Sequence, residues 1–236
     1  MNGQFELRER YAAVLRQIHD ACSLANRDRN AVQLLAVSKT FAADAVLALA
    51  DLGQRAFGEN YVQEALQKIR SLADERPDLP LEWHFIGPIQ SNKTRPIAES
   101  FAWVHSIERL KIAERLSAQR PVGMPPLNVC LQVNVSGEAS KSGCSPAEVS
   151  TLAFALAALP NLRLRGLMAI PEPIDDPGLQ RRRFTHLRAL FEQLRAQGLV
   201  VDTLSMGMSA DLEAAIAEGS TLVRVGSAIF GSRTHS

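Results

Sequence analysis

The fold can be argued from one stretch of the sequence, Leu34-Leu35-Ala36-Val37-Ser38-Lys39-Thr40. Four consecutive apolar residues without polar alternation are typical of a strand that is buried on both faces, as in a parallel sheet. This strand runs directly into Lys39, where it meets its outgoing loop. In a closed parallel α/β barrel, chemistry takes place at this end of the strands. A lysine amine shielded there by apolar walls can have its pKa lowered enough to attack a carbonyl group. A solvated lysine that simply ends a strand is the alternative.

Composition and charge exclude several classes of protein. The 236 residues include 26 Lys+Arg and 25 Asp+Glu, which leaves no excess charge to attract nucleic acid or a membrane surface. Three widely spaced cysteines make neither a disulfide framework nor a zinc site, and the histidines show no metal-ligand spacing. The N-terminus has no apolar signal region, and the longest apolar run, 152–159, is too short to span a bilayer. We therefore expect a soluble cytoplasmic protein without a metal site.

Strand-like and helix-like segments alternate along the whole chain. Seven further strands follow the first one, a helical segment separates each strand from the next, and an additional helix at 5–26 precedes them all. The further strands are predicted at 55–57, 83–86, 101–105, 127–133, 162–168, 200–204 and 221–225. The intervening helices are predicted at about 42–52, 61–74, 90–98, 107–116, 146–159, 178–197 and 210–218, with Ser106 and Ser209 as the N-caps of two of them.

Eight strands joined by helices predict an α/β fold, a (β/α)8 TIM barrel with an extra N-terminal helix. An open, doubly wound sheet is the alternative, because hydrophobic periodicity alone does not separate the two. The count favours the barrel, since eight is the number of strands that closes. No room remains for a second domain, so we expect residues 1–236 to form a single domain.

Closure of the barrel predicts which residues meet at its mouth. The eighth strand would lie beside the first, which brings Arg224 and Gly226-Ser227 near Lys39. In such barrels the loops after strands seven and eight often bind phosphate. Here these loops, 205–209 and 226–227, offer glycines for close approach and hydroxyl groups as donors. Ordinary turn and cap chemistry is the alternative for each loop alone. Together they favour a phosphorylated carbonyl compound, and pyridoxal 5′-phosphate (PLP) carries both groups on one ring.

The chain resembles the pyridoxal phosphate homeostasis protein family, PLP-binding proteins related to the barrel domain of alanine racemase. The resemblance covers nearly the whole chain, and the unbroken block 83–93 is its most specific part. Ser227 is a departure, because threonine is expected in relatives, but serine keeps the hydroxyl and the backbone N–H. The other matching stretches are Ala36-Val37-Ser38-Lys39-Thr40, Phe57-Gly58-Glu59-Asn60-Tyr61-Val62-Gln63-Glu64, Gly166-Leu167-Met168-Ala169, Leu204-Ser205-Met206-Gly207-Met208-Ser209 and Arg224-Val225-Gly226-Ser227-Ala228-Ile229-Phe230-Gly231.

The resemblance implies a role for each residue of the mouth. Lys39 would form the aldimine, or Schiff base, with PLP. The phosphate would be held by Ser205, Ser209, Gly226 and Ser227, the ring would be lined by Asn60 and Met168, and the pyridine nitrogen would face Arg224. A guanidinium is always charged and only donates hydrogen bonds, so a pyridine nitrogen that faces it must stay unprotonated. That weakens the ring as an electron sink, so the cofactor would be held but poorly primed for carbanion chemistry.

Two functions follow from such a site. The first is PLP homeostasis, in which the protein holds PLP on Lys39 and buffers it or delivers it to apo PLP-dependent enzymes. The second is an amino-acid racemase, which needs a proton donor on each face of the substrate carbon. Alanine racemases supply a tyrosine from a second domain, whereas this chain has only Tyr11, on the added helix and packed against the barrel, and Tyr61 near the mouth. We favour homeostasis because the second base is missing.

Two further expectations concern the surroundings of the site. The loop at 134–145 follows the fifth strand, is polar and rich in glycine and serine, and is expected to form a mobile cover over the cofactor. The absence of a dimer-completing domain favours a monomer.

Overall fold

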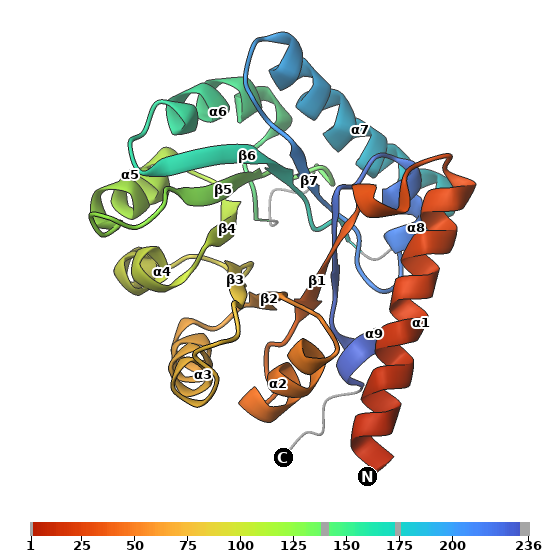
Figure 1. Cartoon of the computed structure of the whole chain (residues 1–236). Coiled ribbons are helices and arrows are strands. Elements are labelled where there is room, and N and C mark those ends of the chain that lie inside the picture. Colours follow the sequence, from red (N-terminus) through yellow and green to blue (C-terminus); the bar gives the residue numbers. More distant parts are fainter. Residues whose placement is uncertain (1, 138–141, 173–175, 232–236) are drawn as a thin grey trace.

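The barrel predicted from the sequence is present and closed. The computed structural model describes residues 2–137, 142–172 and 176–231. Within these ranges eight parallel strands close in the order β1 to β8, with helices around them (Figure 1). Because β1 pairs with β8, the open doubly wound alternative is wrong. The strands are β1 Gln33–Val37, β2 Ala56–Glu59, β3 Glu82–Phe85, β4 Trp103–Ile107, β5 Leu127–Gln132, β6 Leu162–Met168, β7 Thr203–Ser205 and β8 Leu222–Val225.

The helices occupy the positions that the alternation predicts, with one addition near the C-terminus. They are α1 Asn2–Leu24, α2 Ala43–Asp51, α3 Val62–Glu75, α4 Thr94–Ser100, α5 Leu110–Gln119, α6 Val149–Ala157, α7 Pro177–Ala196, α8 Leu212–Ala217 and α9 Ser227–Phe230, with short 3-10 turns η1 Arg29–Ala31, η2 Ser91–Lys93 and η3 Pro146–Glu148. The extra helix α1 packs against α8 and α9 at the side where the barrel closes (Figure 1). Tyr11 is buried there and donates a hydrogen bond to Gln54, which confirms its packing against the barrel. None of the described helices is long and apolar enough to cross a membrane.

Both predicted serine caps are wrong. Strand β4 continues through Ser106 to Ile107, and the Ser106 hydroxyl donates to the carbonyl of Gly87 instead of capping a helix. Helix α5 therefore begins only at Leu110. Ser209 likewise precedes the start of α8, whose N-cap residue is Asp211. In both cases the strand is longer at its C-terminal end than predicted, because β4 ends at Ile107 and β7 ends at Ser205.

The seventh and last elements also differ from the prediction. Strand β7 begins at Thr203 rather than at residue 200, because the apolar Val200 is 90% exposed and lies outside the sheet. The four-residue helix α9 was not predicted, since so short a segment shows no periodicity. Its Phe230 stacks on Phe41 at 4.8 Å between ring centroids, which fixes the loop after β1 against the C-terminal segment.

The interior of the barrel is divided between apolar and polar side chains. Inward positions of β1, β2 and β8 form one apolar cluster, and a second cluster contains Trp103, Cys130 and Met168. Between them lie His84 and His105, both fully buried and hydrogen-bonded to each other at 2.9 Å. Burial lowers the pKa of His84 and lowers that of His105 well below its usual value. Burial therefore favours the neutral form of both imidazoles in the folded protein.

Stability should fall as the pH drops below 6.5, because the unfolded chain takes up protons on these two histidines more readily than the folded chain does. A histidine that is protonated only in the unfolded chain contributes about 1.4 kcal/mol per pH unit, so His105 should supply a slope of about that size near pH 5, and His84 adds to it. Urea unfolding at a series of pH values measures it. His105→Gln should lower the slope by about one proton, and equal slopes for the two proteins would contradict the assignment.

Candidate cofactor site

A pocket of about 340 Å³ opens at the C-terminal mouth of the barrel. Six of the eight residues predicted for the site line it together, namely Lys39, Asn60, Ser209, Arg224, Gly226 and Ser227. Apolar side chains of Val37, Phe41, Ile86 and Ile170 complete much of the wall. The other two predicted residues, Met168 and Ser205, are fully buried deeper in the barrel. The pocket therefore combines an amine, a guanidinium, hydroxyl groups and glycine backbone on an apolar surface.

Strand periodicity explains why Lys39 faces the pocket. Leu35 and Val37 point to the inside of the barrel, and Lys39 continues this inward row at the mouth. Ser38 points the other way, is fully buried, and donates a hydrogen bond of 2.6 Å to Glu59 Oε1. The residue before Lys39 is thus anchored between β1 and the helical layer.

An ion triad of Glu59, Glu64 and Lys68 holds the backbone on both sides of Lys39. The Lys68 ammonium donates to Glu59 Oε1 at 2.6 Å and to Glu64 Oε1 at 2.8 Å. It also donates to the carbonyl oxygen of Ser38 at 2.8 Å. Glu64 Oε1 accepts a hydrogen bond of 2.6 Å from the Thr40 N–H. Thr40 has φ 69°, in the left-handed region, so this contact stabilises a strained turn next to Lys39.

The triad is sensitive to the loss of any member. Glu59 is fully buried, and burial raises the pKa of its carboxyl group, while the hydrogen bonds from Lys68 and Ser38 oppose that rise. Its second oxygen, Oε2, has no hydrogen-bond partner among the described residues. A buried carboxylate that loses its cation is strongly destabilising. The sequence prediction missed these residues, because a charged residue that ends a strand does not reveal that its partner lies on the next helix.

Arg224 lies under the pocket and is fixed by three hydrogen bonds. Its Nη1 donates to both the carbonyl oxygen and the Oγ of Ser205 at 2.7 Å, and its Nη2 donates to the carbonyl oxygen of Ala169 at 2.8 Å. Burial lowers its pKa to about 10, so the group is still charged at neutral pH. Ser205 is thus engaged by Arg224, and its Oγ also lies 2.8 Å from His105 Nδ1.

The glycine of the loop after β8 permits a close approach of two strands. A Cβ atom on Gly226 would lie 3.1 Å from the carbonyl oxygen of Val37, so a larger residue would press against β1 next to Lys39. Ser227, the first residue of α9, and Ser209 contribute hydroxyl groups to the same wall. Backbone N–H groups and hydroxyls of this kind suit the oxygens of a phosphate.

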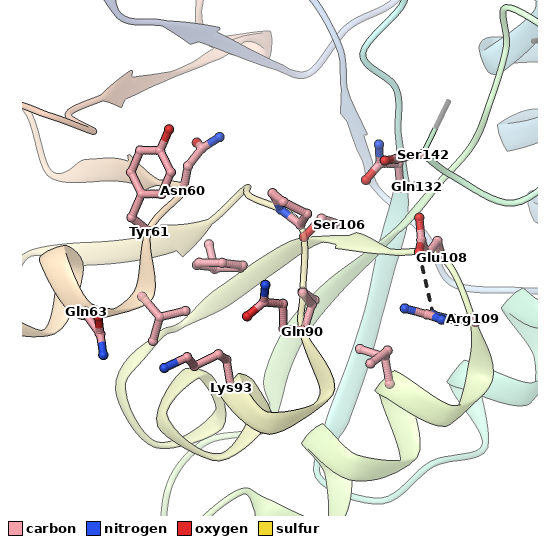
Figure 2. A pocket seen from close by; sticks show the side chains of 15 residues that line it. Asn60, Tyr61, Gln63, Gln90, Lys93, Ser106, Glu108, Arg109, Gln132 and Ser142 are labelled. Carbon is pink, nitrogen blue, oxygen red and sulfur yellow. Dashed lines mark ion pairs between the residues drawn. The ribbon is translucent and has the colours of Figure 1, made fainter. Parts of the chain in front are cut away.

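Asn60 separates this pocket from a neighbouring cavity of about 440 Å³. Its Oδ1 is buried without a hydrogen-bond partner in the described part of the chain. This oxygen can therefore accept a hydrogen bond from a donor inside the pocket. Figure 2 shows Tyr61 beside Asn60 at one edge of that cavity. Tyr61 is 55% exposed and does not line the pocket that contains Lys39.

The predicted cover loop at 134–145 is described only in part, because residues 138–141 lie outside the described residues. Its flanks are joined by a bridge between Val133 and Cys144. The Gly143 N–H donates to Glu108 Oε2 at 3.1 Å, and Ser142 reaches the wall of the neighbouring cavity (Figure 2). That the loop is a mobile cover stays a prediction.

Comparison with known proteins defines the class. A family model described as alanine racemase, N-terminal domain, matches residues 12–234. An alanine racemase from Corynebacterium glutamicum shares the fold, with a TM-score of 0.67 at 18% identity over 95% of this chain and 62% of that chain. The barrel is thus an alanine racemase-type domain.

Closer relatives identify the family. Two proteins named pyridoxal phosphate homeostasis protein are similar over nearly their whole length: one from Pseudomonas aeruginosa is 62% identical over 96% of each chain, and one from Escherichia coli K12 is 52% identical over 95% of this chain and 96% of the relative. The chain belongs to the pyridoxal phosphate homeostasis protein family. The structure of PipY from Synechococcus elongatus with PLP bound has a TM-score of 0.77 at 38% identity, over 91% of this chain and all of that chain.

Replacing Lys68 should destabilise the protein and loosen the loop that carries Lys39. Lys68→Met leaves the Glu59 carboxylate buried and unpaired, so we expect the free energy of unfolding to fall by about 3–5 kcal/mol in urea titrations. Hydrogen exchange at the Thr40 amide should speed up as well. Lys111→Met, at an exposed position of α5, is the matched control and should change neither quantity. A variant at Lys68 as stable as this control would refute the role of the triad.

Proposed function

We propose that this protein holds PLP at Lys39 and serves intracellular PLP homeostasis by buffering the cofactor or delivering it. One observation carries the proposal: Lys39, Arg224 and the hydroxyl- and glycine-bearing loops line one pocket of about 340 Å³. The names of the relatives and the PLP-bound structure of PipY support it.

The residues of the pocket suit the parts of the ligand. Lys39 would bind the aldehyde carbon covalently, and Ser209, Gly226 and Ser227 would donate to the phosphate. Asn60 would face the ring, with its orphan Oδ1 as an acceptor. Met168 and Ser205 would act on the ligand indirectly, by holding Arg224 in place. Ser205 accepts a hydrogen bond from Arg224, and Met168 precedes Ala169, whose carbonyl oxygen accepts another. When bound, PLP supplies an electrophilic carbonyl and a conjugated ring.

Arg224 argues for a carrier rather than a catalyst. A charged guanidinium can only donate, so a pyridine nitrogen beside it accepts and stays unprotonated. The ring then withdraws electrons less strongly, which disfavours the carbanion chemistry of a racemase. Among the described residues that line this pocket there is no tyrosine to act as a second acid/base group, since Tyr61 belongs to the wall of the neighbouring cavity. Both features favour holding and release over racemisation.

The setting of this function is part of the proposal. The recipients would be apo PLP-dependent enzymes, the compartment the cytoplasm, and the active form a monomer. The three cysteines are free and buried, which suits a reducing compartment.

Borohydride reduction tests covalent binding. The protein incubated with PLP should absorb visible light, lose that band on reduction, and give a pyridoxyl-modified peptide containing Lys39. Lys39→Ala should abolish both the band and the adduct. Lys93→Ala, which removes a lysine from the neighbouring cavity, should keep both. A colourless protein that takes up no PLP would refute the proposal.

Transfer and exchange assays separate the carrier from the racemase. Loaded protein mixed with an apo PLP-dependent enzyme should restore that enzyme's activity, because hydrolysis of the covalent bond to Lys39 returns the lysine amine and the free PLP aldehyde. Deuterium should not enter the α-position of alanine in heavy water beyond the rate seen with free PLP. Rapid exchange that Lys39→Ala abolishes would favour the racemase instead.

A further inference from the structure

A continuous row of hydrogen bonds crosses the inside of the barrel from the N-terminal end of its strands to Arg224. It begins at Glu82, the first residue of β3, whose Oε1 lies 2.9 Å from His84 Nε2. His84 Nδ1 lies 2.9 Å from His105 Nε2, and His105 Nδ1 lies 2.8 Å from Ser205 Oγ. Arg224 Nη1 completes the row at 2.7 Å from the same oxygen. Barrel interiors are usually filled by bulky apolar residues, so this row requires an explanation.

The direction of the bonds follows from the carboxylate end of the row. A carboxylate only accepts, so His84 carries its proton on Nε2 and donates to Glu82. A neutral imidazole with its proton on Nε2 has a bare Nδ1, so His84 Nδ1 accepts from His105 Nε2. By the same rule His105 Nδ1 accepts the hydrogen of the Ser205 hydroxyl. At the other end a guanidinium has no acceptor, so Arg224 Nη1 donates to Ser205 Oγ.

Both ends of the row match this direction. At the lower end Glu82 is a carboxylate, which only accepts, and the hydrogen bond from His84 lowers its pKa. At the upper end the buried Arg224 cation meets the oxygen end of the Ser205 hydroxyl dipole. Aligned hydrogen bonds of this kind polarise one another and strengthen the whole chain. Reversal of any link would bring two donors or two acceptors face to face.

The surroundings leave this direction unopposed. Trp103 stacks on His84 with ring centroids 5.2 Å apart, and Arg165 lies over Trp103 at 4.6 Å. Arg165 is paired with Asp202 at 2.7 Å on the outer side, and the Arg165 charge further favours ionised Glu82. Near the mouth, the Asp211 charge favours the cationic form of Arg224.

We propose that Glu82, His84, His105 and Ser205 form a one-way hydrogen-bond chain that positions the Arg224 guanidinium for the ligand at the opposite end of the barrel. The two histidines are positioning residues: neither is among the residues that line the pocket, and they act through Ser205. The hydrogen-bond chain consists only of contacts within the protein and does not depend on a ligand. Only the identity of the group that Arg224 faces rests on the proposed function.

The tautomers of the two histidines test the direction of the chain without any ligand. In the protein free of PLP, nitrogen-15 NMR should find both imidazoles neutral at pH 7, with protons on Nε2 and bare Nδ1 atoms. A proton on Nδ1 of either ring, or a charged ring, would overturn the proposal. This outcome is independent of whether Lys39 binds PLP.

Two variants of His105 test what the chain does. In His105→Gln the amide oxygen can accept from Ser205 and the amide nitrogen can donate to His84, so the direction survives. His105→Leu has a similar volume but breaks the row. We expect His105→Leu to weaken PLP binding about tenfold and to shift the visible band, whereas His105→Gln should stay within about threefold of the wild type.

The comparison distinguishes positioning from packing. If His105 served only to fill space, leucine would substitute better than glutamine, and equal or greater loss in His105→Gln would refute the chain. A fold check by circular dichroism accompanies both variants. If His105→Leu does not fold, the wild-type tautomers and the affinity of His105→Gln still decide. Failure of the wild type to bind PLP would refute the proposed function and leave the tautomer result standing.

Discussion

The pairing of β1 with β8 is the contact on which the site depends. In this register Leu35 lies beside Arg224, and Ala36 lies beside Val225. The first strand then delivers Lys39 to the mouth at the same level as the loop that follows β8. Gly226 allows the two backbones to approach closely, and α9 turns back so that Phe230 stacks on Phe41. Residues nearly 190 positions apart along the chain form a single wall because the sheet closes.

The parts of the structure that repeat could be predicted from the sequence. The apolar run 34–37 and the alternation of leucine and arginine that opens 162–168 identify strands. Eight such strands predict closure and, with it, the meeting of Lys39 with Arg224. Segment ends were less accurate, because they depend on pairing with neighbours. Ser106 resembles a helix N-cap locally, but Ile107 pairs with Leu131 and extends β4 through it. The pairing of β4 with β5 therefore outweighed the local N-cap signal of Ser106.

The polar interactions that support the site could not be predicted, because their partners are distant in sequence and chemically ambiguous. Glu59 ends a strand and looks like any surface carboxylate until α3 places Lys68 over it. His84 and His105 are 21 residues apart, and His105 and Ser205 are 100 apart. Neither separation has a periodic signature. A polar residue at an inward position of a barrel strand is the signal that could have identified them, once the face of each strand is known.

The distribution of the pocket along the chain has a consequence for synthesis. Lys39 is synthesised 185 residues before Arg224, and the barrel has no β1–β8 seam until β8 arrives. A nascent chain therefore carries its lysine without the pocket that surrounds it. A ligand that spans Lys39 and Gly226 would bind only the finished protein and, by mass action, would hold the seam closed. Ligand binding at the mouth and the pairing of β1 with β8 are then thermodynamically coupled, so each stabilises the other.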